Sequence, residues 1–231
     1  MTLQSIASNI AAVRREIAAA ATECGRDPGA IELIAVSKTQ PTAAVRAAAA
    51  AGCGAFGENY PAEAAAKQDE LEDLDVTWHF IGAIQSNKTR LIASRFDWVH
   101  TVDRAKIARR LSEQVPPGRT LDVCLQVNVD RDPNKAGVDP QDAAALLAET
   151  RALPNLRIRG LMTILHPQSP PRAGYQRLAD LFQALRSLAP EPWDTLSMGM
   201  SNDYREAIAA GATHIRVGTA IFGARAAAGT S

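Results

Sequence analysis

Apolar side chains recur at helical spacing close to the N-terminus, and this pattern predicts an amphipathic helix over residues 3 to about 22. Gly25 and Pro28 follow the last periodic position, and both residue types are typical of a helix end. We therefore expect a helix that packs one face against the rest of the molecule. Its apolar face is formed by Leu3, Ile6, Ile10, Val13 and Ile17.

Beyond residue 30, short runs of apolar and β-branched residues alternate with longer runs at helical spacing. Such alternation is typical of a parallel sheet. Eight strands in a chain of this length favour a closed (β/α)8 TIM barrel, and an open doubly wound sheet is the main alternative. The predicted strands are 31–37, 55–59, 77–83, 98–103, 122–129, 158–164, 195–199 and 214–222. The predicted helices lie near 41–51, 61–72, 85–94, 104–114, 139–150, 172–188 and 202–210.

The chain has 231 residues, close to the ~250 of a typical single barrel domain. Its two proline-rich patches, near residues 116–118 and 167–171, are typical of turns rather than of domain boundaries. We therefore predict one domain over residues 1–231. It would consist of an N-terminal helix (1–25), a barrel (31–223) and a tail (224–231).

The charges balance, with 25 Lys and Arg against 25 Asp and Glu, so no net field would attract the chain to nucleic acid or to a membrane. No stretch approaches the ~20 uncharged apolar residues of a membrane span. Cys24, Cys53 and Cys124 are far apart and odd in number, which favours a reducing compartment over a disulfide framework. These features predict a cytoplasmic protein.

Lys38 follows the apolar run 31–37 directly, and Pro41 closes the segment. The carboxyl end of a barrel strand is where α/β enzymes place their chemistry. A lysine held half-buried there loses hydration, its pKa falls, and the free amine can attack a carbonyl. The alternative is a lysine that marks the strand end and reaches into water.

The segments after the last two predicted strands have the composition of a phosphate site. Ser201 or Asn202 could cap the helix that follows the seventh strand, and Gly218 and Thr219 follow the apolar part of the eighth. In barrels, the loops after strands 7 and 8 often bind phosphate through backbone amides and a helix N-terminus. Ordinary caps and turns are the alternative.

Arg216 alternates with apolar neighbours in its strand, which directs it to the barrel interior. An interior arginine needs an acceptor because it cannot lose its proton. Two acceptors fit the sequence: the nitrogen of an aromatic ring, or a nearby carboxylate in a salt bridge.

Two other patterns are weaker. Residues 52–57 match GxGxxG, but they follow a helix and run into a strand, the reverse of a dinucleotide-binding context. His79 and His100 could carry protons, although a lone histidine in an apolar strand is usually a satisfied core residue. No pair of histidines has the spacing of a metal site.

Seven motifs recur in order from about residue 31 to 223, and together they resemble the pyridoxal phosphate homeostasis protein family (YggS/PROSC type). That family is related to the N-terminal domain of alanine racemase, the type III fold of pyridoxal 5′-phosphate (PLP) proteins. The chain departs from the family pattern at Gln40, where many members carry a second lysine. Lys135 matches a family lysine only loosely. The motifs are AVSKT (35–39), FGENY (56–60), WHFIG (78–82), QSNKT (85–89), GLMT (160–163), LSMGMS (196–201) and RVGTAIFG (216–223).

The resemblance implies PLP at the mouth of a single barrel, with Lys38 forming the internal aldimine. Ser201, Gly218 and Thr219 would hold the phosphate, and Arg216 would lie against the pyridine nitrogen. The full set that the resemblance implies is Lys38, Asn59, His79, Met162, Ser197, Met200, Ser201, Arg216, Gly218 and Thr219.

The function implied is to hold, buffer or deliver PLP, with PLP-dependent apoenzymes as the recipients of delivered cofactor. Arg216 is already cationic, so it would keep the pyridine nitrogen unprotonated and weaken the ring as an electron sink. The alternative is a weak PLP-dependent amino-acid racemase or lyase. In alanine racemase a second domain and a partner subunit supply a tyrosine base. The sequence leaves no room for that domain after Gly223, so we expect a monomer.

Overall fold

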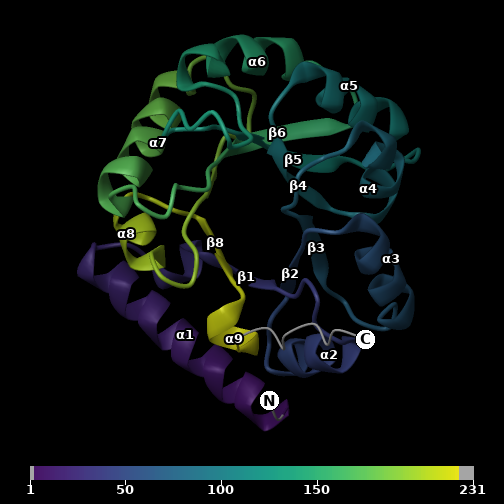
Figure 1. The fold of residues 1–231 in the computed structure, drawn as a ribbon, viewed down its shortest axis with the longest axis vertical. Coiled ribbons are helices and arrows are strands. Elements are labelled where there is room, and N and C mark those ends of the chain that lie inside the picture. Colours follow the sequence, from purple (N-terminus) through teal and green to yellow (C-terminus); the bar gives the residue numbers. More distant parts are fainter. Residues whose placement is uncertain (1–2, 224–231) are drawn as a thin grey trace.

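In the computed structural model, which describes residues 3–223, eight parallel strands close into a single barrel (Figure 1). Consecutive strands are neighbours, and the last strand pairs with the first. This closure confirms the predicted TIM barrel, and the open sheet is wrong. The strands are β1 (Glu32–Val36), β2 (Ala55–Glu58), β3 (Thr77–Phe80), β4 (Trp98–Val102), β5 (Leu121–Gln126), β6 (Leu156–Met162), β7 (Thr195–Ser197) and β8 (His214–Val217).

Helices surround the barrel, and the first of them lies across its outside against α2, α8 and α9 (Figure 1). The predicted apolar face of this helix is buried at Ile6, Ile10, Val13 and Ile17. The helices are α1 (Leu3–Glu23), α2 (Thr42–Ala50), α3 (Pro61–Glu70), α4 (Thr89–Arg95), α5 (Ala105–Gln114), α6 (Ala143–Thr150), α7 (Pro171–Leu185), α8 (Tyr204–Ala209) and α9 (Thr219–Phe222). Short 3-10 turns are η1 (Pro28–Ala30), η2 (Ser86–Lys88) and η3 (Pro140–Asp142).

The prediction of one continuous strand over residues 214–222 is wrong. β8 ends at Val217, and after Gly218 the chain turns into the short helix α9, which buries Ile221 and Phe222. A short apolar run has the same composition in a buried strand and in a buried helix, so periodicity could not separate the two. The predicted tail, 224–231, lies outside the described residues.

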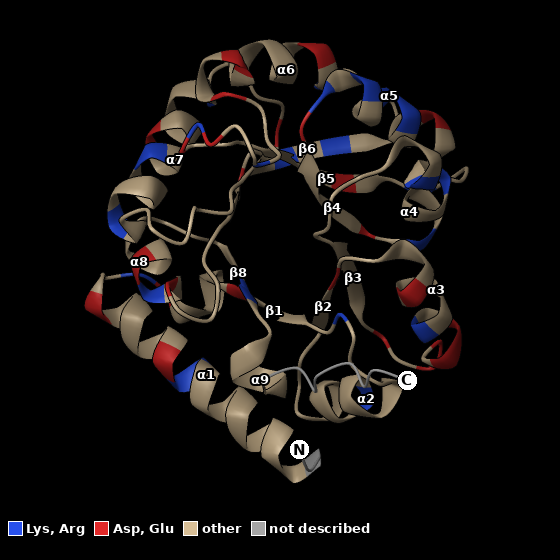
Figure 2. Ribbon diagram, viewed as in Figure 1, with Lys and Arg blue, Asp and Glu red and all other residues tan. Residues whose placement is uncertain are grey.

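Charged side chains of both signs are interspersed over the outer helices (Figure 2). The strands also carry charged residues, and Asp122 on β5 forms an ion pair with Arg157 on β6. Among residues 3–223, no helix has the length and apolar character that a membrane crossing requires.

Three of the chain's four histidines meet Trp98 in the barrel interior. The rings of His79 and Trp98 stack with centroids 5.7 Å apart, and His214 lies 5.1 Å from the Trp98 centroid. His79 Nδ1 and His100 Nε2 are hydrogen-bonded at 2.9 Å. Burial lowers the pKa of His79 and His100 well below the ordinary value and lowers the pKa of His214 to about 4. The barrel therefore encloses these imidazoles in their neutral form.

We predict that the free energy of unfolding falls as the pH is lowered from about 6.5 to 4. In this window the unfolded chain binds protons at these histidines and the folded chain does not, so stability rises with pH. His214 alone accounts for a loss of about 2 kcal/mol between pH 7.5 and pH 5. Urea unfolding at a series of pH values measures the slope. His214→Gln should flatten the curve, and an unchanged slope in that variant would contradict the prediction.

Candidate functional site

A cavity of about 500 Å³ opens at the carboxyl ends of the barrel strands. Seven of the ten predicted site residues line it: Lys38, Asn59, Met200, Ser201, Arg216, Gly218 and Thr219. The other three, His79, Met162 and Ser197, are buried in the barrel interior and are absent from its lining. The structure therefore brings most of the predicted residues together and places the remaining three in the core.

Lys38 is the second residue after β1 and is partly buried in the cavity wall. The residue before it, Ser37, is fully buried, and its amide donates to the Gly57 carbonyl oxygen at 3.0 Å. The residue after it, Thr39, has a left-handed φ of 63°. Lys38 thus stands on a sharp turn at the end of a strand whose backbone is fixed by its neighbour β2.

Arg216 is 4% exposed and enters the same cavity from β8. It donates from Nη1 to Ser197 Oγ at 2.7 Å and from Nη2 to the Thr163 carbonyl oxygen at 2.8 Å. The alternative that Arg216 forms a salt bridge with a nearby carboxylate is wrong, since no carboxylate within residues 3–223 forms an ion pair with it. Burial lowers the pKa of Arg216. A guanidinium held only by neutral oxygens suits an additional electron-rich acceptor from the cavity.

A chain of hydrogen bonds continues from Arg216 into the barrel. Arg216 can only donate, so it takes one acceptor position on Ser197 Oγ. The buried Ser197 hydroxyl then has its own hydrogen for His100 Nδ1, 2.7 Å away. If that hydrogen goes to Nδ1, a neutral His100 carries its proton on Nε2 and can donate it to His79 Nδ1. Ser197 therefore contacts Arg216 directly, and His79 is connected to Arg216 through His100 and Ser197.

The segments after β7 and β8 also line the cavity. The predicted cap at Ser201 or Asn202 is wrong, because α8 begins only at Tyr204 and Asp203 holds the N-cap position. The Asp203 carboxylate instead accepts from the Met200 amide at 2.7 Å and closes a turn. This turn presents Ser201 to the cavity.

Asn59 follows β2, and its side-chain Oδ1 is buried without a hydrogen-bond partner. The end of β3 passes so close that a Cβ at Gly82 would collide with the Asn59 carbonyl oxygen. Glycine at this position therefore lets the two strand ends approach and fixes the Asn59 backbone. An orphaned buried polar atom in a cavity wall is the kind of group that a ligand satisfies.

Part of the cavity wall comes from residues that the sequence did not single out. The segment after β6 contributes Ile164, Leu165, His166, Pro167, Ser169 and Pro171. Its position after a predicted strand was a usable signal, but the prolines were interpreted only as a turn. The His166 amide donates to the Asp130 carboxylate at 2.6 Å, which ties this segment to the loop after β5.

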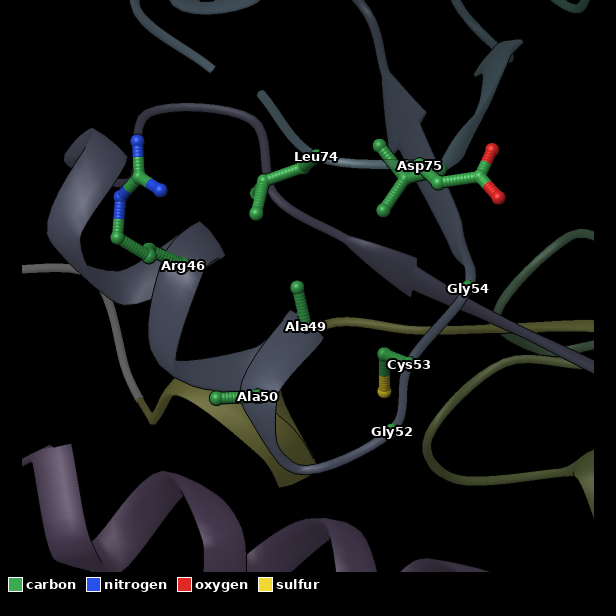
Figure 3. Close-up of a pocket in the computed structure, with 9 residues that line it drawn as sticks. Arg46, Ala49, Ala50, Gly52, Cys53, Gly54, Leu74 and Asp75 are labelled. Carbon is green, nitrogen blue, oxygen red and sulfur yellow. The ribbon is translucent and has the colours of Figure 1, made fainter. Parts of the chain in front are cut away.

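A second hollow of about 440 Å³ lies where α2 ends and β2 begins (Figure 3). Cys53 lines it, and burial raises the pKa of the Cys53 thiol, which makes the thiol a poor nucleophile. Gly52 has a φ of 87° and ends α2, as expected for a helix terminus rather than a dinucleotide fingerprint. This hollow lies at the amino end of the strands, where barrels do not place their chemistry.

Comparisons with known proteins identify the same fold and family. The family model "Alanine racemase, N-terminal domain" matches residues 2–226. The pyridoxal phosphate homeostasis protein of Pseudomonas aeruginosa is 55% identical over 224 residues, covering 96% of this chain and 97% of that protein. PipY of Synechococcus elongatus, solved with PLP bound, has a TM-score of 0.83 at 42% identity, covering 94% of this chain and all of that chain (100%).

Alanine racemase of Corynebacterium glutamicum is more distant, with 20% identity and a TM-score of 0.68 over 99% of this chain and 64% of that chain. This likeness shows a shared barrel fold alone. The family match and the close relative both extend over almost the whole chain. The chain therefore belongs to the pyridoxal phosphate homeostasis protein family, on the barrel that this family shares with the N-terminal domain of alanine racemase.

Proposed function

We propose that this chain binds PLP in the cavity at the barrel mouth and keeps it covalently on Lys38. The observation that carries the proposal is that Lys38 and the carboxylate-free cation Arg216 line one cavity together with the loops after β7 and β8. The family's printed name and the PLP-bound PipY structure support the same ligand. PLP supplies an aldehyde that reacts with amines and a ring that draws electrons from the attached carbon.

The residues present fit each part of this ligand. Lys38 lines the cavity from the turn after β1, and its amine would meet the aldehyde. Ser201, Gly218 and Thr219 would hold the phosphate, since they line the cavity from the turn after β7 and from the start of α9. The orphaned side chain of Asn59 would bond the ring hydroxyl.

Arg216 would lie against the pyridine nitrogen, which supports storage rather than demanding catalysis. Its charge is fixed, and a cation beside the nitrogen opposes protonation there. His79, Ser197 and Met162 would support this side from within the barrel. We further propose that the protein acts as a cytoplasmic monomer that buffers PLP or hands it to PLP-dependent apoenzymes.

Lys38→Ala should abolish covalent retention of PLP while leaving the fold intact, because the amine is at a strand end and outside the core. The measurement is the visible absorption band that survives gel filtration, followed by borohydride reduction and peptide mapping. Lys106→Ala removes an exposed lysine and is the matched control. A reduced, cofactor-bearing peptide that lacks residue 38 would overturn the assignment.

A storage protein should turn over amino acids no faster than free PLP does. Progress curves with single enantiomers, run against an equal concentration of free PLP, test this expectation. Arg216 opposes the protonated ring that efficient catalysis uses, so we expect coincident curves. Sustained turnover above free PLP that disappears in Lys38→Ala would favour the weak racemase or lyase instead.

A further inference from the structure

A buried lysine, Lys67 of α3, lies behind the turn that carries Lys38. Its side chain is 7% exposed, and the cavity lining does not include it. The ammonium donates three hydrogen bonds, to the Ser37 carbonyl oxygen at 2.7 Å, Glu58 Oε1 at 2.8 Å and Glu63 Oε1 at 2.6 Å. A lysine has three donors, so this ammonium is fully committed and fixed in place.

The same side chains hold the backbone on both sides of Lys38. Lys67 binds the carbonyl of the preceding residue, Ser37, and Glu63 Oε1 accepts from the amide of the following residue, Thr39, at 2.6 Å. Thr39 adopts a left-handed φ of 63°, which a β-branched residue rarely does. Such a conformation persists only where its surroundings hold it.

Glu58 completes this group at the end of β2. It is fully buried, and its Oε1 accepts from both Lys67 and the Ser37 hydroxyl, the latter at 2.7 Å. Its Oε2 is buried without a hydrogen-bond partner. Burying a carboxylate costs free energy unless it is paired with a cation. The buried pair Glu58–Lys67 therefore differs from a surface ion pair, which contributes little to stability.

We propose that Lys67, Glu58 and Glu63 form a positioning cluster that holds the turn at residues 37–39 and thereby directs the Lys38 amine into the cavity. The inference rests on the proposed role of Lys38. The cluster links two consecutive β/α units, since β2 and α3 supply its side chains and the turn after β1 receives them. Its members do not touch the cavity, so they act through the backbone of Lys38.

The cluster could influence Lys38 through geometry or through charge, and Glu63 separates the two. Glu63→Gln removes the charge but keeps an oxygen that accepts from Lys67 and Thr39. Glu63→Ala removes both. If the turn is held by hydrogen bonds, the glutamine variant recovers most of the Lys38 reactivity that the alanine variant loses. If charge alone matters, the two variants behave alike.

The experiment measures Lys38 itself, in protein freed of PLP, by competitive labelling with acetic anhydride and peptide mass spectrometry over a range of pH. The exposed Lys106 in the same sample is the internal reference. We expect Lys38 to react about tenfold more slowly relative to Lys106 in Glu63→Ala, because a loosened turn would release the amine into water, where a larger fraction of it is protonated and unreactive. The double variant Lys67→Met/Glu58→Gln removes the buried charges together and should show a similar loss.

Glu70→Ala is the matched control, since Glu70 is an exposed acid on the same helix and contacts Thr42 rather than the turn. A merely structural role would lower the urea midpoint of the cluster variants but leave the Lys38 rate and its pH profile unchanged. That result in both Glu63→Ala and the double variant would overturn the proposal. Labelling needs no PLP, so failure of the wild-type protein to bind PLP would be recognised separately.

Discussion

The hydrogen-bonded pairing of the first strand with the last is the constraint on which the site depends. β1 and β8 run in parallel with Ile34 opposite Arg216. This register brings the end of β1 so close to the end of β8 that a Cβ at Gly218 would lie 3.3 Å from Val36. Lys38 therefore leaves the barrel beside the first turn of α9. If the same strand order were left open, β1 and β8 would be the two edge strands, and no shared cavity could form between their ends.

Two buried cations, Lys67 and Arg216, lie near the paired strands β1 and β8, and they differ in how their charges are compensated. Lys67 is compensated by Glu58 and Glu63, so its charge is balanced within the protein. Arg216 is bound by a hydroxyl and a carbonyl and has no carboxylate at ion-pair distance within the described residues. Because an uncompensated buried charge is expensive, the protein carries a cost at Arg216 that a ligand with electron-rich atoms can offset. The compensated cation belongs to the scaffold, and the other belongs to the cavity.

The barrel and much of the cavity were predictable because they follow from local patterns. Each strand carries its own apolar signature, and a residue just after a strand lies at the mouth, which is why Lys38 was expected there. Arg216 was directed to the barrel interior by its alternation with apolar neighbours in β8. The depth of Ser197 and Met162 was not predictable, because it depends on how far each strand penetrates the barrel and not on which face a residue occupies. The contacts of Lys67 were also not predicted. They join the turn after β1, the strand β2 and the helix α3, and they depend on how these elements pack rather than on a local sequence pattern.

The neutral acceptors around Arg216 also bear on what a bound cofactor could do there. A carboxylate beside a pyridine nitrogen shares a proton with it and strengthens the ring as an electron sink. Ser197 cannot take this role, because its hydroxyl oxygen accepts from Arg216 and its second hydrogen bond is made with His100. The histidines behind it are held neutral by burial, so they lack the additional proton that an imidazolium could give up. A barrel organised in this way, with PLP placed as proposed, retains the aldehyde on its lysine while leaving the ring in its less reactive form, and that combination suits a reservoir better than a catalyst.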